Sequence, residues 1–198
     1  MEQYGFTRLS LAAPIKLLGE AARCQQWDFA TGVLETLFPC LDDLGRATRV
    51  FSDLAADYEV ELGGGGKPRG FLQALGQRMR ERVYRDVWVD YLIARMRVTE
   101  GPVVVDDLRY RNEARALRGE GVRLVRLCVD EAERRRRVQV AYPELEPALL
   151  DHVSEHNLDD WCFDWTISTN TEGEAARQLE VFMAANPWLN SQQNERSL

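Results

Sequence analysis

The chain has 198 residues, of which 45% are hydrophobic and 29% are charged, with a formal net charge of −7. This length suits one well-filled domain, and the acidic balance argues against an overall basic surface for nucleic acid, although a local basic groove stays open. We expect no membrane span and no secretion signal. The four cysteines are scattered and include no C-x-x-C pair, which favours reduced thiols in the cytoplasm over a zinc site.

The N-terminal half predicts one strand followed by helices. Residues 6–11 alternate apolar and polar side chains, as a half-buried strand does, and Pro14 suits the first turn of a helix. The expected elements are, in order, a strand at 6–11, a helix at 14–23, helices over 27–62 with breaks near Pro39 and Gly45, a flexible glycine loop at 63–68, and one or two helices over 70–96.

The C-terminal half predicts strands that alternate with helices. The expected elements are a strand at 103–105, a helix at 112–120 that stops at Gly121, a strand at 122–127, an arginine-dense helix at 130–138, a proline-bearing segment to about 160, a strand at 163–168, a helix at 172–185 and a flexible tail at 191–198. This alternation predicts a parallel sheet in an α/β layer architecture. We expect a single domain over residues 1–190, with a mobile cover at about 130–160.

Polar side chains follow the strand at 103–105, at its carboxyl end. Asp106, Asp107 and Arg109 come directly after three valines. In open parallel sheets, ligands bind at this end of the strands. A carboxylate there can hold a hydrated Mg²⁺, and an arginine can clamp a phosphate at two points. The alternative is a polar cap that leads into the helix at 112–118.

The run from Arg134 to Arg137 lies on a predicted helix. Residues three apart share a helix face, so Arg134 and Arg137 can point together toward a polyphosphate. The alternative is a solvated face that is balanced by Asp130, Glu131 and Glu133. The position before a proline-bearing segment favours a mobile cover over a phosphate site.

Three further segments invite comparison with phosphate binding. His152, Ser154 and Glu155 form a compact polar stretch that could cap a helix or contact a phosphate. Lys67 follows four glycines, but Pro68 stands where the phosphate-binding loop G-x-x-x-x-G-K-[ST] needs a hydroxyl, so a hinge is the better interpretation. Lys16 could reach an anionic substrate or be an exposed helix lysine.

Several segments together resemble one family, the deoxynucleoside monophosphate kinases, which are P-loop kinases of tailed bacteriophages and some bacteria. The matching segments are residues 4–10 with 12–16, 72–76, 86–89, 107–114, 152–155 with 158–160, and 163–170. The resemblance implies a three-layer P-loop nucleotide-kinase fold with a parallel sheet and a helical lid at about 130–160. It also implies transfer of the γ-phosphoryl group from ATP to a deoxynucleoside monophosphate with Mg²⁺.

The resemblance assigns roles to individual residues. It places Asp107 and Arg109 at the phosphoryl centre, with Asp107 as the metal ligand, and Asn170 near the base of ATP. Arg134 and Arg137 become catalytic lid residues. Those implied to bind substrate are Ser10, Lys16, Gln73, Trp88, His152, Ser154 and Glu155.

Two departures from the family pattern affect these expectations. Members usually carry an acidic residue near Ala13 and Thr-Glu where this chain has Gln77-Arg78, so the accepted base is not defined. The family's first strand and phosphate-binding loop would precede Tyr4. We therefore expect that about 15–25 residues of upstream reading frame supply them, judged from the size of a strand–loop–helix unit.

Two alternative functions follow from the same residues. One is a nucleotide-binding or scaffold protein that has lost turnover. The other is a phage kinase acting on a modified base in DNA, which would need a basic groove near Arg78–Arg85 and is disfavoured by the acidic net charge. The kinase interpretation implies the cytoplasm (of the host, for a phage protein), no nucleic-acid or membrane partner, and leaves a homodimer open.

Overall fold

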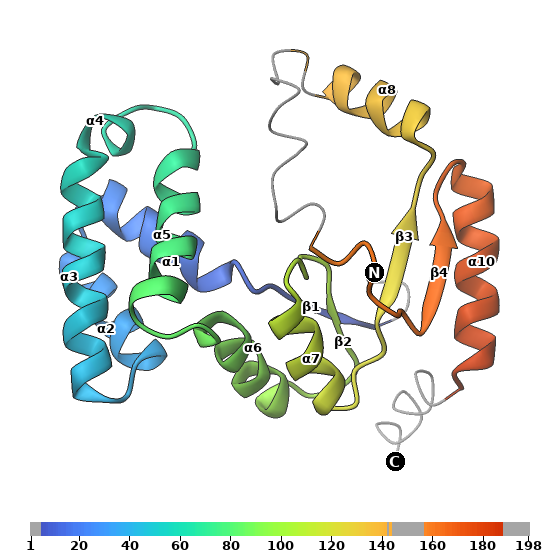
Figure 1. Ribbon diagram of the computed structural model, residues 1–198, viewed down its shortest axis with the longest axis horizontal. Helices are drawn as coiled ribbons and strands as arrows, with labels where there is room; N and C mark the ends of the chain where they lie inside the picture. Colours follow the sequence, from blue (N-terminus) through green and yellow to red (C-terminus); the bar gives the residue numbers. More distant parts are fainter. Residues whose placement is uncertain (1–4, 142, 144–156, 188–198) are drawn as a thin grey trace. The chain divides into compact units, whose positions relative to one another are not determined.

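A computed structural model describes residues 5–141, 143 and 157–187 of the chain (Figure 1). Its contacts divide the chain into two compact units. The helical unit comprises residues 8–99 and 105–107, and the strand unit comprises the described residues among 1–7, 100–104 and 108–198. Each unit is described by itself.

The helical unit begins with a short strand and continues as helices. Its elements are β1 (Thr7–Leu9), whose first residue belongs to the strand unit, α1 (Ala13–Arg23), α2 (Trp27–Leu37), α3 (Leu41–Asp57), α4 (Glu59–Leu62), α5 (Arg69–Arg82) and α6 (Val87–Val98). Pro14 lies in the first turn of α1, as expected from its fixed φ and missing N–H. The break near Pro39 is confirmed between α2 and α3, and the region 70–96 forms two helices.

The expected break at Gly45 is wrong, because α3 continues through that residue. Gly45 is exposed, and an added Cβ there would meet no atom within 4 Å. The helix is instead fixed by its opposite face, where Ala47, Phe51 and Leu54 are buried. Burial of this apolar face outweighs the roughly 1 kcal/mol that glycine costs inside a helix.

Close helix packing forms the core of the helical unit. At Gly19 of α1 an added Cβ would lie 2.4 Å from the Leu72 side chain of α5, so any larger residue there would force the Leu72 side chain to move. Phe51 of α3 and Phe71 of α5 meet edge-to-face, with their ring centroids 6.2 Å apart. The edge-to-face geometry adds to the stabilisation from burying both rings.

The strand unit is built on two parallel strands, β3 (Val125–Cys128) and β4 (Trp165–Ser168). In their register Val125 lies opposite Trp165 and Cys128 lies opposite Ser168. Helix α10 (Glu172–Ala185) packs on β4 (Figure 1), where the rings of Trp165 and Phe182 meet edge-to-face at 5.7 Å. The other helices are α7 (Arg111–Gly119) and α8 (Glu131–Ala141).

Helix α7 is anchored at its start by a buried carboxylate. Glu113 is 1% exposed and accepts hydrogen bonds from the backbone N–H groups of Tyr110 (3.1 Å) and Arg109 (3.2 Å). This is the return half of a capping box, which satisfies donors that the first helical turn leaves unpaired. The helix ends before Gly121, whose φ of +78° suits glycine.

The α/β class is confirmed, with β3 and β4 parallel as expected. Among the described residues, however, the strands form two separate two-stranded sheets, β1 with β2 (Val103–Val105) and β3 with β4, instead of one sheet. No helix in the described part of the chain is long and apolar enough to cross a membrane. The tail at 191–198 lies outside the described residues.

Candidate functional site

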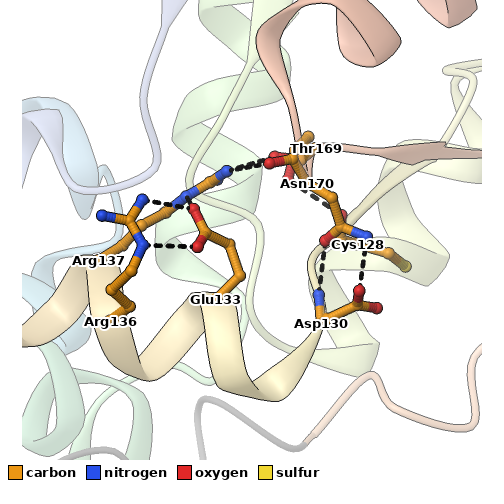
Figure 2. Close-up of polar contacts among 7 residues, drawn as sticks. All are labelled: Cys128, Asp130, Glu133, Arg136, Arg137, Thr169 and Asn170. Carbon is orange, nitrogen blue, oxygen red and sulfur yellow. Dashed lines mark hydrogen bonds and ion pairs between the residues drawn. The ribbon is translucent and has the colours of Figure 1, made fainter.

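The carboxyl ends of β3 and β4 carry a connected set of polar groups (Figure 2). The backbone N–H and the hydroxyl of Thr169 both donate to the carbonyl of Cys128, at 2.7 and 2.9 Å. One residue further along, Asn170 and Asp130 pair at two points. The Asp130 N–H donates to Oδ1 of Asn170, and Nδ2 of Asn170 donates to Oδ2 of Asp130, each at 2.8 Å. The two strand ends are thereby locked side by side.

Arg137 ties helix α8 to the end of β4. Its guanidinium donates to the carbonyl oxygens of Thr169 (2.6 Å) and Asn170 (3.0 Å) and to the carboxylate of Glu133 (2.7 Å). Figure 2 shows Arg136 on the same carboxylate, with its Nε 2.7 Å from Oε2. Glu133 therefore holds two arginines, one of which also contacts the β4 end.

The same pattern occurs two residues earlier on α8. Glu131 accepts from Nε of Arg134 at 2.9 Å and from Nε of Arg135 at 2.7 Å. No residue of α8 is buried, so these ion pairs are solvated and weak. An incoming polyphosphate offers more charge than a carboxylate, so these arginines can exchange partners at small cost.

The Glu133 carboxyl should titrate far below its usual range. The hydrogen bonds from Arg136, and then from Arg137, lower the pKa of Glu133 from 4.5 to about 2. The stabilisation from this pairing is therefore complete above pH 4.5 and is lost only as the pH falls through about 2. A carbon-detected NMR titration of the Glu133 side chain should show it ionised at pH 4. A midpoint near 4.5 would contradict the pairing.

Asp107 belongs to the helical unit and caps the start of α1. Its Oδ2 accepts from the Ser10 hydroxyl (2.6 Å) and the Ala12 N–H (3.0 Å), and its Oδ1 accepts from the Leu11 N–H (2.9 Å). A carboxylate oxygen has two lone pairs, so Oδ1 keeps capacity for a water of a hydrated Mg²⁺. Among the described residues no group of three or more metal-ligating side chains occurs. Since Mg²⁺ often takes only one or two protein carboxylates and keeps its waters, Asp107 fits such a role.

The other residues implied by the resemblance lie in several places. Arg109 is exposed at the start of the α7 segment, Lys16 is exposed on α1 and Gln73 is exposed on α5. Trp88 is 1% exposed, and its Nε1 donates to the Gly76 carbonyl at 3.1 Å, which places it in the helical core. His152, Ser154 and Glu155 lie outside the described residues.

The structure thus brings together some of the expected residues. Arg137 and Asn170 meet directly, and Ser10 meets Asp107. Asp107 is in the helical unit, whereas Arg134 and Arg137 are in the strand unit. Asp130 and Thr169 were not expected as site residues. Their signal in the sequence is that each lies within three residues of the end of a predicted strand, as Asn170 does.

Comparisons with known proteins add no assignment. No protein-family model, no curated protein and no solved structure matches the chain.

Proposed function

We propose that this chain is a deoxynucleoside monophosphate kinase, which transfers the γ-phosphoryl group of ATP to a deoxynucleoside monophosphate. The observation that carries the proposal is the contact of Arg137 and Asn170 at the carboxyl ends of the parallel strands β3 and β4. Ligands of open α/β sheets bind at this end. The ordered sequence segments that resemble this family give the reaction, and the finer three-layer kinase fold is part of the proposal.

Each group of site residues has a separate role in the proposed reaction. The β4 end at Thr169 and Asn170 would border the base of ATP, while Arg134 and Arg137 would neutralise charge on the phosphates. Asp107 would hold a water of Mg²⁺, and the bound Mg²⁺ would supply charge neutralisation of the transferred group. Ser10, Lys16 and Gln73 would bind the acceptor nucleotide. The substrates place this activity in the cytoplasm.

Phosphoryl transfer is tested by direct detection of product. The chain is incubated with ATP, Mg²⁺ and each deoxynucleoside monophosphate, and nucleotides are separated by ion-exchange chromatography. We expect Mg²⁺-dependent formation of a deoxynucleoside diphosphate and ADP in equal amounts with at least one acceptor. A polypeptide extended with the upstream reading frame is assayed in parallel. Absence of product from both forms with every acceptor would overturn the kinase proposal.

A second candidate function is nucleotide binding without turnover. It is favoured by the engagement of both Asp107 oxygens in the cap of α1, and by the absence of G-x-x-x-x-G-K-[ST] in these 198 residues. Calorimetry then detects binding of ATP while chromatography detects no product. A kinase for modified bases in DNA predicts product only with a DNA acceptor.

Replacing Asn170 by alanine should weaken ATP binding about tenfold, because the two-point pairing with Asp130 fixes the strand ends beside the base. Calorimetry on wild-type and variant proteins measures the change in Kd. The matched control is Arg177→Gln, which removes an exposed cation from α10 in the same unit. If Asn170→Ala and the wild type bind ATP with equal Kd, Asn170 does not belong to the ATP site.

A further inference from the structure

The two lysines of this chain line one cavity of the helical unit. Lys16 comes from α1 and Lys67 from the loop between α4 and α5, 51 positions later in the sequence. The cavity has a volume of about 350 Å³ and is also lined by Gly65, Gly66 and Arg23. Lys16 and Lys67 are the chain's only lysines, and apart from two histidines its other basic residues are all arginines. That both lysines line the same hollow is the first sign of an anion site.

The charges around this cavity do not cancel. Its one carboxylate, Glu20, is engaged by Arg23 through Nε at 3.0 Å and Nη2 at 2.5 Å. This pairing lowers the pKa of Glu20, so the carboxylate stays ionised and offsets only the arginine. Among the described residues neither lysine has an ion-pair partner. The cavity therefore keeps two uncompensated positive charges.

The loop adds a row of hydrogen-bond donors. Within the described part of the chain, the backbone N–H groups of Gly65, Gly66 and Lys67 have no acceptor. Successive backbone N–H groups in a turn can bind an anion, as they do in many phosphate sites. At Gly65 and Gly66 an added Cβ would meet nothing within 4 Å, so open space lies beside the Cα atoms of both residues.

The two ends of this loop are held in place. Gly64 N–H donates to the Glu61 carbonyl at 3.2 Å. The Glu61 carboxylate accepts from the N–H groups of Gly70 (2.8 Å) and Phe71 (2.9 Å) at the start of α5. One residue thus closes the loop on both sides. A loop whose ends are fixed loses less entropy when its amides bind a ligand.

We propose that this cavity binds a phosphate group, held by Lys16 and Lys67 and by the amides of Gly65 and Gly66. A small oxyanion with more than one charge matches the two ammonium groups and the row of donors. A volume of about 350 Å³ lies at the low end for ligand pockets, which suits a small phosphate compound. All residues of the site belong to the helical unit. The site shares Lys16 with the proposed acceptor-nucleotide site, and its phosphate binding is measured without phosphoryl transfer.

The two lysines permit a direct test. Reductive methylation with ¹³C-formaldehyde labels Lys16, Lys67 and the terminal amine, and dimethylated lysine keeps its charge. The labelled protein is titrated with inorganic phosphate, and separately with pyrophosphate, at constant ionic strength. We expect both lysine signals to shift with one saturable Kd while the terminal amine signal stays in place. Signal shifts that fail to saturate, or that are equal for all labelled amines, would contradict specific phosphate binding in this cavity.

Variants separate the two kinds of donor. Lys16→Gln and Lys67→Gln should each weaken phosphate binding about tenfold, read from the remaining lysine signal. Gly66→Pro removes an N–H and should weaken it several-fold, whereas Gly66→Ala keeps the N–H and should bind as wild type. Arg49→Gln, an exposed cation of α3 in the same unit, is the control for net charge. Variants that all bind equally, or citrate binding as tightly as phosphate, would contradict the proposal.

Discussion

Replacing Asp107 by alanine is expected to lower the free energy of unfolding by about 2–3 kcal/mol. The carboxylate accepts three hydrogen bonds from Ser10, Leu11 and Ala12. These groups precede α1, which has no other side-chain cap. Truncation leaves half-buried donors without an acceptor. Urea unfolding followed by circular dichroism measures the difference from the midpoint shift at constant slope.

The neighbouring aspartate provides the matched control. Asp106 pairs with Arg8 at 2.9 Å, and the two side chains are 39% and 57% exposed. Such a surface pair contributes little, so Asp106→Ala should change the free energy of unfolding by no more than about 0.5 kcal/mol. If both variants are equally stable, Asp107 does not cap α1. The Asp107 carboxylate would then serve Mg²⁺ only. In that case Asp107→Ala would lose more product than Asp106→Ala in the phosphoryl-transfer assay.

Replacing Trp88 by alanine is expected to cost about 3–5 kcal/mol of unfolding free energy. The indole is 1% exposed, its N–H donates to the Gly76 carbonyl, and its neighbours Val87 and Val89 are equally buried. The substitution leaves a cavity between α5 and α6 and removes the indole hydrogen bond, while the Gly76 carbonyl keeps its bond from Arg80 Nη1 at 3.1 Å. Trp88→Phe keeps most of the ring and should cost about 1–2 kcal/mol. Thermal and urea unfolding measure both values.

Trp27 of α2 is the control for this second prediction, because it lies in the same unit and is 47% exposed. Trp27→Ala should cost less than half as much as Trp88→Ala. A stable Trp88→Ala variant with weakened nucleotide binding would instead support the substrate role that the family resemblance implies. Stability and binding are therefore measured on the same preparations.

The elements with a clear pattern were predictable from the sequence. The strand Val103–Val105 and the helix Glu172–Ala185 have the expected bounds, because a run of valines and a capped amphipathic stretch act locally. The strand expected at 122–127 begins only at Val125. Leu124 is held by Asp164, whose carboxylate accepts from the Leu124 N–H at 2.8 Å. That contact joins residues 40 positions apart and has no local signature.

The candidate site was only partly predictable. Arginines on α8 and polar residues after the strands can be found in the sequence, but their partners depend on the β3–β4 register, which short strands do not encode. The pairing of Asn170 with Asp130 is an example. The cavity of Lys16 and Lys67 needed the packing of α1 against the loop before α5, which periodicity does not reveal.

The most direct test of the central claim maps ATP onto the strand ends. Isotope-labelled protein is titrated with ATP and Mg²⁺, and backbone and side-chain amide signals are followed by NMR. We expect the Asn170 side-chain amide and the N–H groups of Asp130 and Thr169 to show the largest saturable shifts, with the Arg137 Nε signal moving as its partner changes. Saturable ATP binding that leaves these signals unmoved would contradict a nucleotide site at the ends of β3 and β4.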